Sequence, residues 1–181
     1  MIFRSYADIL LKQHINDSYH LLHANMVAYA MDKYAELKGF DRDMYFITGL
    51  LHDVDFGAAY DVNQHGSLSI IWLKNEDIDQ KVLHAIQSHV EHRTHIKPES
   101  ELDFALIACD EICGLMYAYS AIRPEKFKNL KVKSLVECFN NKKFAVKVDR
   151  QLILQGITGI HTTLEDHLAF LVSVFQDFEY E

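Results

Sequence analysis

The sequence has few residues that interrupt or cross-link a chain. Only two prolines and seven glycines occur in 181 residues, which leaves long segments without helix breakers and favours helices. The three cysteines, Cys109, Cys113 and Cys138, lack the paired spacing of a zinc ribbon or a disulfide framework, so we interpret them as reduced core residues. No run approaches about 18 uncharged apolar residues, and the first residues lack a signal-peptide pattern. We therefore expect a cytoplasmic protein with no membrane partner.

Basic residues are in the minority and are unevenly spread. The chain has 18 Lys and Arg against 26 Asp and Glu, a net charge of −8, which argues against binding of duplex nucleic acid. Residues 123–150 nevertheless hold nine of the basic residues and only three of the acidic ones. This local excess of positive charge is consistent with an anionic substrate, and a solvated basic face is the alternative.

Apolar residues at helical spacing indicate an all-α protein with a single domain, residues 1–181. We expect a compact helical bundle with a core over 18–122, a basic helical segment over 123–155 and a C-terminal helix over 163–178. Gly156 and Gly159 are expected to separate the last two helices. The apolar face of the C-terminal helix either packs on the core or forms a homodimer interface. Helices are predicted over 18–38, 42–53, a short segment ending at Trp72, 77–90, 101–122, 125–138, 141–155 and 163–178.

The pair His52-Asp53 directly follows the apolar run 47–51. Burying an imidazole and a carboxylate at such a place is costly unless something binds them, and a divalent cation does so well. His23, His89 and Asp110 share predicted helix faces with apolar residues and should point inward. A single buried histidine is usually a satisfied core residue, and an aspartate such as Asp110 can pair with an arginine instead.

The joint occurrence of these groups indicates a metal site, to which His65 can add a ligand from the opening turn of its helix. Imidazole and carboxylate ligands suit divalent Mn, Fe, Zn, Ni or Mg, and the absence of cysteine ligands argues against a structural zinc. The predicted ligands are His23, His52, Asp53, His65, His89 and Asp110. The other histidines are expected to be solvated or to lie at ordinary surface or interface positions: His14, His20, His84, His92, His95, His161 and His167.

The order of these residues resembles the HD superfamily of metal-dependent phosphohydrolases. The pattern of a histidine, then His-Asp, then a distant aspartate is matched by His23, His52-Asp53 and Asp110. The segment 49–55 is similar to that of small HDIG-type members, with Val54-Asp55 in place of their Ile-Gly. The segments 110–115, 121–124, 132–134 and 144–150 are also similar. The resemblance implies a helical domain in which these four residues hold one metal ion, while His65 and His89 add a second and Asp53 bridges the two.

The activity that the resemblance implies is hydrolysis of a phosphate ester. A divalent cation lowers the pKa of a bound water from about 15.7 toward 7 and so supplies a nucleophile at neutral pH. Asp53 would orient that water, and Asp55 would act as a nearby base. The substrate would be a nucleotide or another small phosphorylated metabolite. Arg123, Lys133 and Arg150 are the predicted phosphate contacts, although each could bridge helices instead.

Two other functions stay open from the sequence. Similar ligands in HD-type oxygenases hold two iron ions and cleave a C–C or C–P bond, which would show as iron content and oxygen consumption. A non-enzymatic module would use the ligands only to hold a structural or sensory metal. Such a module would fold normally and turn over no phosphate ester.

Overall fold

A computed structural model describes residues 2–56 and 62–178 of the chain. This part is all-helical, with ten α-helices, one short 3-10 turn and no strands, which confirms the predicted all-α class. The helices are α1 (Arg4–His14), α2 (Ser18–Lys38), α3 (Arg42–Leu51), α4 (Ser67–Leu73), α5 (Gln80–Ser88), α6 (Glu91–Thr94), α7 (Glu101–Ala121), α8 (Val132–Asn140), α9 (Arg150–Gly159) and α10 (Leu164–Phe175); the 3-10 turn is η1 (Val62–Gln64).

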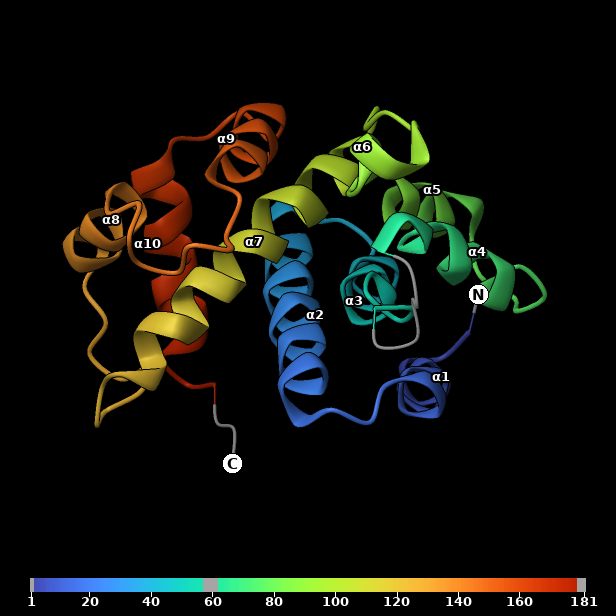
Figure 1. Cartoon of the computed structure of the whole chain (residues 1–181), viewed down its shortest axis with the longest axis horizontal. Helices are drawn as coiled ribbons and strands as arrows, with labels where there is room; N and C mark the ends of the chain where they lie inside the picture. The colour runs from blue at the N-terminus through green and yellow to red at the C-terminus, as the bar shows by residue number, and fades with distance from the viewer. Residues whose placement is uncertain (1, 57–61, 179–181) are drawn as a thin grey trace.

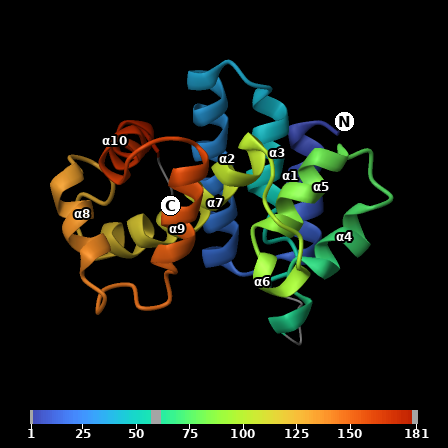
Figure 2. The same cartoon turned by 90° about the horizontal axis from the view of Figure 1, so that it is seen from above.

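Helix α2 runs through the middle of the molecule and separates two hydrophobic clusters (Figures 1 and 2). One cluster includes buried side chains of α2, α7, α8, α9 and α10, among them Met26, Leu106 and Phe175. The other includes buried side chains of α1, α2, α3, α4 and α5, among them Leu50 and Ile86. The bundle therefore has two adjoining cores that share one central helix.

Polar caps fix where the principal helices begin. Asp17, Asp41 and Asp79 each accept hydrogen bonds from backbone amides of the first turn of α2, α3 and α5. Ser100 begins α7 with a capping box that Asp103 completes. Gly39 ends α2 in the left-handed conformation, with φ of 73°, as its place after the helical pattern predicts. The predicted bounds of α2, α3, α5, α7 and α10 are correct to within a few residues.

Helix α4 also ends within one residue of the predicted Trp72. The remaining helices differ from the prediction: α1 and the short α6 are not predicted, while α8 and α9 lie several residues later than the segments 125–138 and 141–155. Gly156 lies inside α9 instead of ending it, whereas Gly159 is its last residue. An added Cβ on Gly156 would lie 2.3 Å from the backbone nitrogen of Ala108 in α7, so this glycine permits close helix packing. The sequence also predicts a loop at Gly57 and at 61–63, of which residues 57–61 lie outside the described residues.

Among the described residues, α7 is long and apolar enough by composition to cross a membrane, and 56% of the apolar window is buried inside the protein. Helix α7 does not contain about 18 consecutive uncharged apolar residues, because acidic residues such as Asp110 and Glu111 interrupt its apolar sequence. A central helix of a two-sided core has the same composition, because it is covered by other helices on several faces.

Candidate metal centre

The predicted ligands come from five separate segments and converge at one place. His23 lies on α2 and Asp110 on α7, while His52 and His89 are the residues that directly follow α3 and α5. Asp53 follows His52, and His65 lies shortly before α4. Side chains that are up to 87 positions apart in the sequence therefore meet where the two halves of the bundle adjoin.

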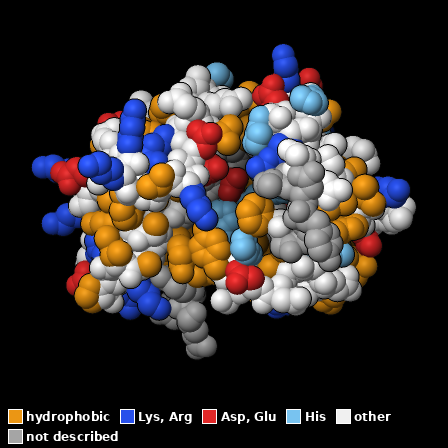
Figure 3. Space-filling model, in the orientation of Figure 1, with side chains coloured by type: hydrophobic (Ala, Val, Ile, Leu, Met, Phe, Trp, Pro, Cys, Tyr) orange, Lys and Arg blue, Asp and Glu red, His pale blue; other side chains and the backbone are white. Residues whose placement is uncertain are grey.

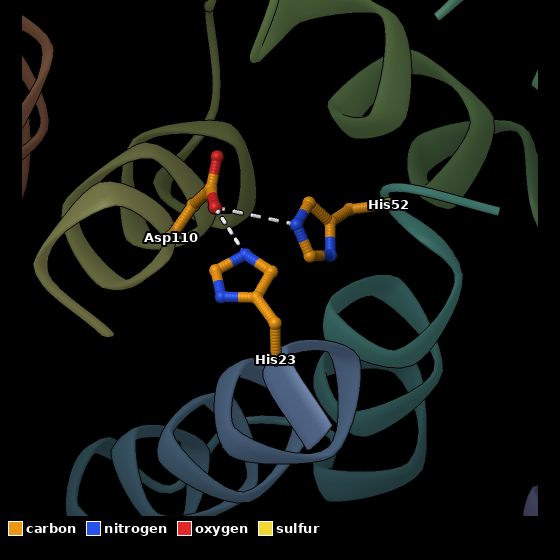
Figure 4. Close-up of side chains that lie close together, drawn as sticks. All are labelled: His23, His52 and Asp110. Carbon is orange, nitrogen blue, oxygen red and sulfur yellow. Dashed lines mark hydrogen bonds and ion pairs between the residues drawn. The ribbon is translucent and has the colours of Figure 1, made fainter. Parts of the chain in front are cut away.

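One group of three ligands is formed by His23, His52 and Asp110. His23 Nε2 lies 2.9 Å from Asp110 Oδ1, and His52 Nε2 lies 3.3 Å from the same oxygen. Figure 4 shows both imidazoles turned toward this carboxylate from different helices. Their ligand atoms all lie within 4.8 Å of one another, so this group could hold a metal ion.

A second group is formed by Asp53, His65 and His89, and it meets the same spacing. His65 Nε2 lies 3.2 Å from Asp53 Oδ1, and His89 Nε2 lies 3.5 Å from that oxygen. The other oxygen of Asp53, Oδ2, lies 3.5 Å from His52 Nε2 and 4.0 Å from His23 Nε2. Asp53 thus turns one oxygen to each group, which is the arrangement of a carboxylate that can bridge two cations.

Backbone carbonyls orient two of the imidazoles. His52 Nδ1 donates to the carbonyl oxygen of Gly49 over 2.8 Å, and His89 Nδ1 donates to that of Ile86 over 2.5 Å. Each acceptor lies in the last turn of the preceding helix, where carbonyls have no partner within the helix. In the neutral ring the proton is therefore on Nδ1, and Nε2, which faces the centre, is the nitrogen that can bind a metal ion.

The Nε2 atoms of His52 and His89 are buried and make no hydrogen bond within the described part of the chain. A buried polar atom without a partner is costly, and two such atoms at one place indicate a missing ligand. Imidazole nitrogens and carboxylate oxygens are the donors that borderline divalent cations accept. The residues present therefore fit a metal ion.

Opposite charges dominate the electrostatics of the centre. Burial disfavours protonation of His52 and His65, but the neighbouring carboxylates outweigh it and raise the pKa of His52 to about 9 and that of His65 to about 10. Burial likewise opposes ionisation of Asp53 and Asp110, yet the imidazoles hold the pKa of both carboxyls well below the usual range. The two carboxylates are thus ionised and require positive charge beside them, which a divalent cation supplies.

Asp55 does not face the pocket and has a role different from the predicted base. Its Oδ1 accepts from His65 Nδ1 over 2.7 Å, and its Oδ2 accepts from the backbone amides of Gly66 and Ser69 at the start of α4. Burial would raise the pKa of Asp55, but these hydrogen bonds hold it below its ordinary value. Both oxygens are occupied, so the carboxylate orients His65 rather than accepting a proton from water.

The centre lies at the floor of a pocket of about 300 Å³. Figure 3 shows the hollow on this face, with acidic and histidine side chains inside it and Lys or Arg side chains near its edge. Five of the six predicted ligands line the pocket, and His52 lies just beneath it, fully buried. The remaining walls are formed by Tyr19, His20, Phe56, Val90, His92, Arg93, Glu111, Gly114, Lys147, Val148 and Leu152.

None of the three predicted phosphate contacts lines this pocket. Arg150 donates to the carbonyl of Phe139 in α8 and to those of four residues between α8 and α9, and so holds that connection in place. Arg123 donates to the carbonyl of Lys128 over 2.7 Å and lies over the ring of Tyr119. Lys133 is exposed on α8. Arg150 and Arg123 therefore connect parts of the fold, which is the alternative role that the sequence analysis gives them.

The basic groups that do line the pocket are Arg93, which belongs to α6, and Lys147. His20, His92 and Glu111 also reach it, although the sequence prediction placed both histidines elsewhere. One signal was available for His20, because it lies one helical turn before His23 and shares its face. The places of the other pocket residues could not be predicted, because they depend on how α6 and the segment before α9 fold over the centre. His167, predicted at the surface or an interface, is buried and donates to the carbonyl of Ala108.

Compared with known proteins, the chain matches no protein-family model, no curated protein and no solved structure. The resemblance to the HD superfamily therefore stays a prediction from the motifs.

Proposed function

We propose that this protein is a metal-dependent phosphohydrolase acting on a nucleotide or another small phosphorylated metabolite. The observation that carries the proposal is the pair of three-ligand groups at the floor of one pocket, joined by the two oxygens of Asp53. A mononuclear structural site would need no shared carboxylate and no open pocket beside it. The arrangement instead resembles centres that place two cations against one substrate.

Two divalent ions, of Mn, Fe, Zn, Ni or Mg, are the occupants that we infer. One would be held by His23, His52 and Asp110, the other by His65 and His89, with Asp53 shared between them. When bound, such ions supply Lewis acidity toward a phosphoryl oxygen and a nucleophilic water at neutral pH.

The protein's own side chains support a phosphate as the bound group. Arg93 and Lys147 line the pocket and supply positive charge, and an arginine can pair with two phosphate oxygens at once. Beyond His92 and Leu152, an adjoining hollow of about 530 Å³ is also lined by Glu91, His95, Lys97 and Gln155. This gives room for the part of the substrate that leaves with the ester oxygen. A di-iron oxygenase that cleaves a C–C bond would use the same ligands without a general need for these cationic groups. One that cleaves a C–P bond would also bind an anion, and oxygen consumption distinguishes it.

The test measures metal content and phosphate release on the same protein. Wild type, Asp53→Asn and Asp8→Asn are purified untagged, analysed for metals, and assayed with p-nitrophenyl phosphate, nucleoside monophosphates and sugar phosphates after loading with Mn²⁺ or Mg²⁺. We expect about two equivalents of metal in wild type. Asp53→Asn should lose metal and at least roughly 10²-fold in kcat/KM, because the shared ligand is gone. Asp8, which pairs with Lys12 on α1, is a matched control and should behave as wild type.

Three results would contradict the proposal. Metal retention without phosphate release from any ester would favour a structural or sensory module. Oxygen consumption by the iron-loaded protein, with no phosphate release, would favour an oxygenase. Phosphate release that Asp53→Asn leaves unchanged would place the activity somewhere other than this centre.

A further inference from the structure

His20 lines the same pocket but belongs to neither ligand group. It lies in the first turn of α2, three residues before His23, so both side chains project on one face about one helical turn apart. Its ring contacts Phe56, with centroids 4.9 Å apart, and Tyr19 edge-on at 5.2 Å. These two aromatic residues also line the pocket and hold the imidazole at its wall.

Asp17 fixes the orientation of this imidazole. As the cap of α2, its Oδ1 accepts from the backbone amide of His20 over 3.0 Å, and the same oxygen lies 2.8 Å from His20 Nδ1. With Nδ1–H donated to the carboxylate, Nε2 is the ring atom that can serve the pocket. A carboxylate that orients an imidazole and stabilises its protonated form is the supporting element of many acid–base catalysts.

The other titratable groups of the pocket wall differ from His20 in charge or in bonding. Burial and the nearby Arg93 lower the pKa of His92, which disfavours its protonated form. Arg93 and Lys147 supply positive charge to the wall. Burial and the neighbouring Asp110 raise the pKa of Glu111 to about 7, and its Oε2 accepts from the backbone amide of Asp149, which ties α7 to the start of α9. Among the described wall residues outside the two ligand groups, His20 alone has a carboxylate on its far ring nitrogen.

We propose that His20 is the general acid that protonates the leaving oxygen of the substrate, with Asp17 as its positioning residue. This inference rests on the proposed phosphohydrolase activity. The oxygen of water forms a new bond to phosphorus while the ester P–O bond breaks and leaves its electron pair on the departing oxygen. His20 Nε2 gives its proton to that oxygen, and the proton released by the water restores the imidazolium. The net change is phosphate ester plus water to alcohol plus inorganic phosphate.

The poorer the leaving group of an ester, the more the rate of its hydrolysis depends on a general acid. A comparison of esters with different leaving groups therefore tests the proposal. Metal-loaded wild type, His20→Gln, Asp17→Asn and Glu111→Gln are assayed with p-nitrophenyl phosphate, phenyl phosphate and an alkyl phosphate. The nitrophenolate leaves without a proton, whereas an alkoxide needs one. For His20→Gln we expect kcat/KM to fall roughly 10²–10⁴-fold with the alkyl ester and less than about tenfold with p-nitrophenyl phosphate.

Asp17→Asn should show the same pattern to a smaller degree, since asparagine still caps α2. Metal content and thermal unfolding of each variant exclude loss of the centre or the fold. An equal loss of kcat/KM with all three esters would overturn the proposal, because it indicates a structural role. So would a leaving-group-dependent loss in Glu111→Gln with none in His20→Gln. If wild type releases no phosphate from any ester, the proposed function itself fails, a result distinct from either of these.

Discussion

Each imidazole of the second ligand group has its outer nitrogen held by the protein. His89 uses a carbonyl at the end of α5, and His65 uses Asp55, which in turn accepts two backbone amides of α4. His23 differs, because its Nδ1 is buried and has no hydrogen-bond partner among the described residues. The orientation of most ligands is therefore set by local hydrogen bonds before any ion binds, which lowers the entropy lost on binding.

Replacing Asp55 tests this control of orientation. Asp55→Asn replaces one acceptor oxygen by an NH₂ group. That group would face another hydrogen-bond donor, either His65 Nδ1–H or a backbone amide at the start of α4. We expect a drop of roughly 10–100-fold in affinity for the ion held by Asp53, His65 and His89, with the ion at His23, His52 and Asp110 retained. Isothermal titration calorimetry with Mn²⁺ measures the affinity and the stoichiometry of both ions. An unchanged affinity and stoichiometry would show that Asp55 does not control the centre.

At the scale of helices, the distance between α2 and α3 depends on one glycine. A Cβ on Gly49 would lie 2.8 Å from the backbone nitrogen and Cα of Ala28, so only glycine allows the two helices to approach this closely. His23 is five residues before Ala28 and His52 is three residues after Gly49. The packing of this pair therefore sets how far apart the two histidines lie.

Gly49→Ala should separate the two helices. Because the added methyl group meets backbone and not a movable side chain, we expect a loss of about 1–3 kcal/mol in the free energy of unfolding and weaker metal binding. Denaturant unfolding measures the first effect. Gly114→Ala in α7 is the matched control, since its Cβ would meet only Val148 Cγ2 at 3.7 Å. That change should be neutral or stabilising by up to about 1 kcal/mol. Equal destabilisation by both substitutions would contradict the packing argument.

At the scale of the whole molecule, the centre lies where the two hydrophobic clusters adjoin. α2, α3 and α5 contribute buried residues to both clusters, whereas α7 contributes to one. Ligands from all four helices, or from the residues that follow them, meet at Asp53. A cation bound there would connect the two halves of the bundle and would favour the folded state over the unfolded chain.

Metal should therefore stabilise the entire fold and not only the pocket. At a concentration of Mn²⁺ about 100 times the Kd, the expected gain is about 2.7 kcal/mol, or roughly 5–10 °C in Tm for a chain of this size. Thermal unfolding with Mn²⁺ and then with EDTA measures it. Asp53→Asn should show little shift. A shift of the same size in that variant would mean that the ion binds elsewhere.

Prediction from the sequence succeeded where local pattern decides structure. The inward faces of His23 and Asp110 follow from helical periodicity, and the predicted start at residue 42 agrees with the start of α3 after its cap Asp41. The prediction failed where a contact with a distant part of the fold determines the role of a side chain. Arg150 has the charge of a phosphate ligand, but neighbouring carbonyls occupy its guanidinium. Asp55 has the chemistry of a base, but α4 and His65 occupy its oxygens.

The sequence by itself determined the helical class, because its apolar period is that of a helix and few residues break it. It also determined which residues can bind a metal, since ligand chemistry belongs to the side chain. Only the tertiary structure decided that six such residues form two groups of three, with the oxygens of Asp53 between them, and that Arg93, Lys147 and His20 line the pocket in place of the predicted cations. The physical reason is that helix packing, fixed by close contacts such as Gly49 on Ala28, sets distances that no local pattern encodes.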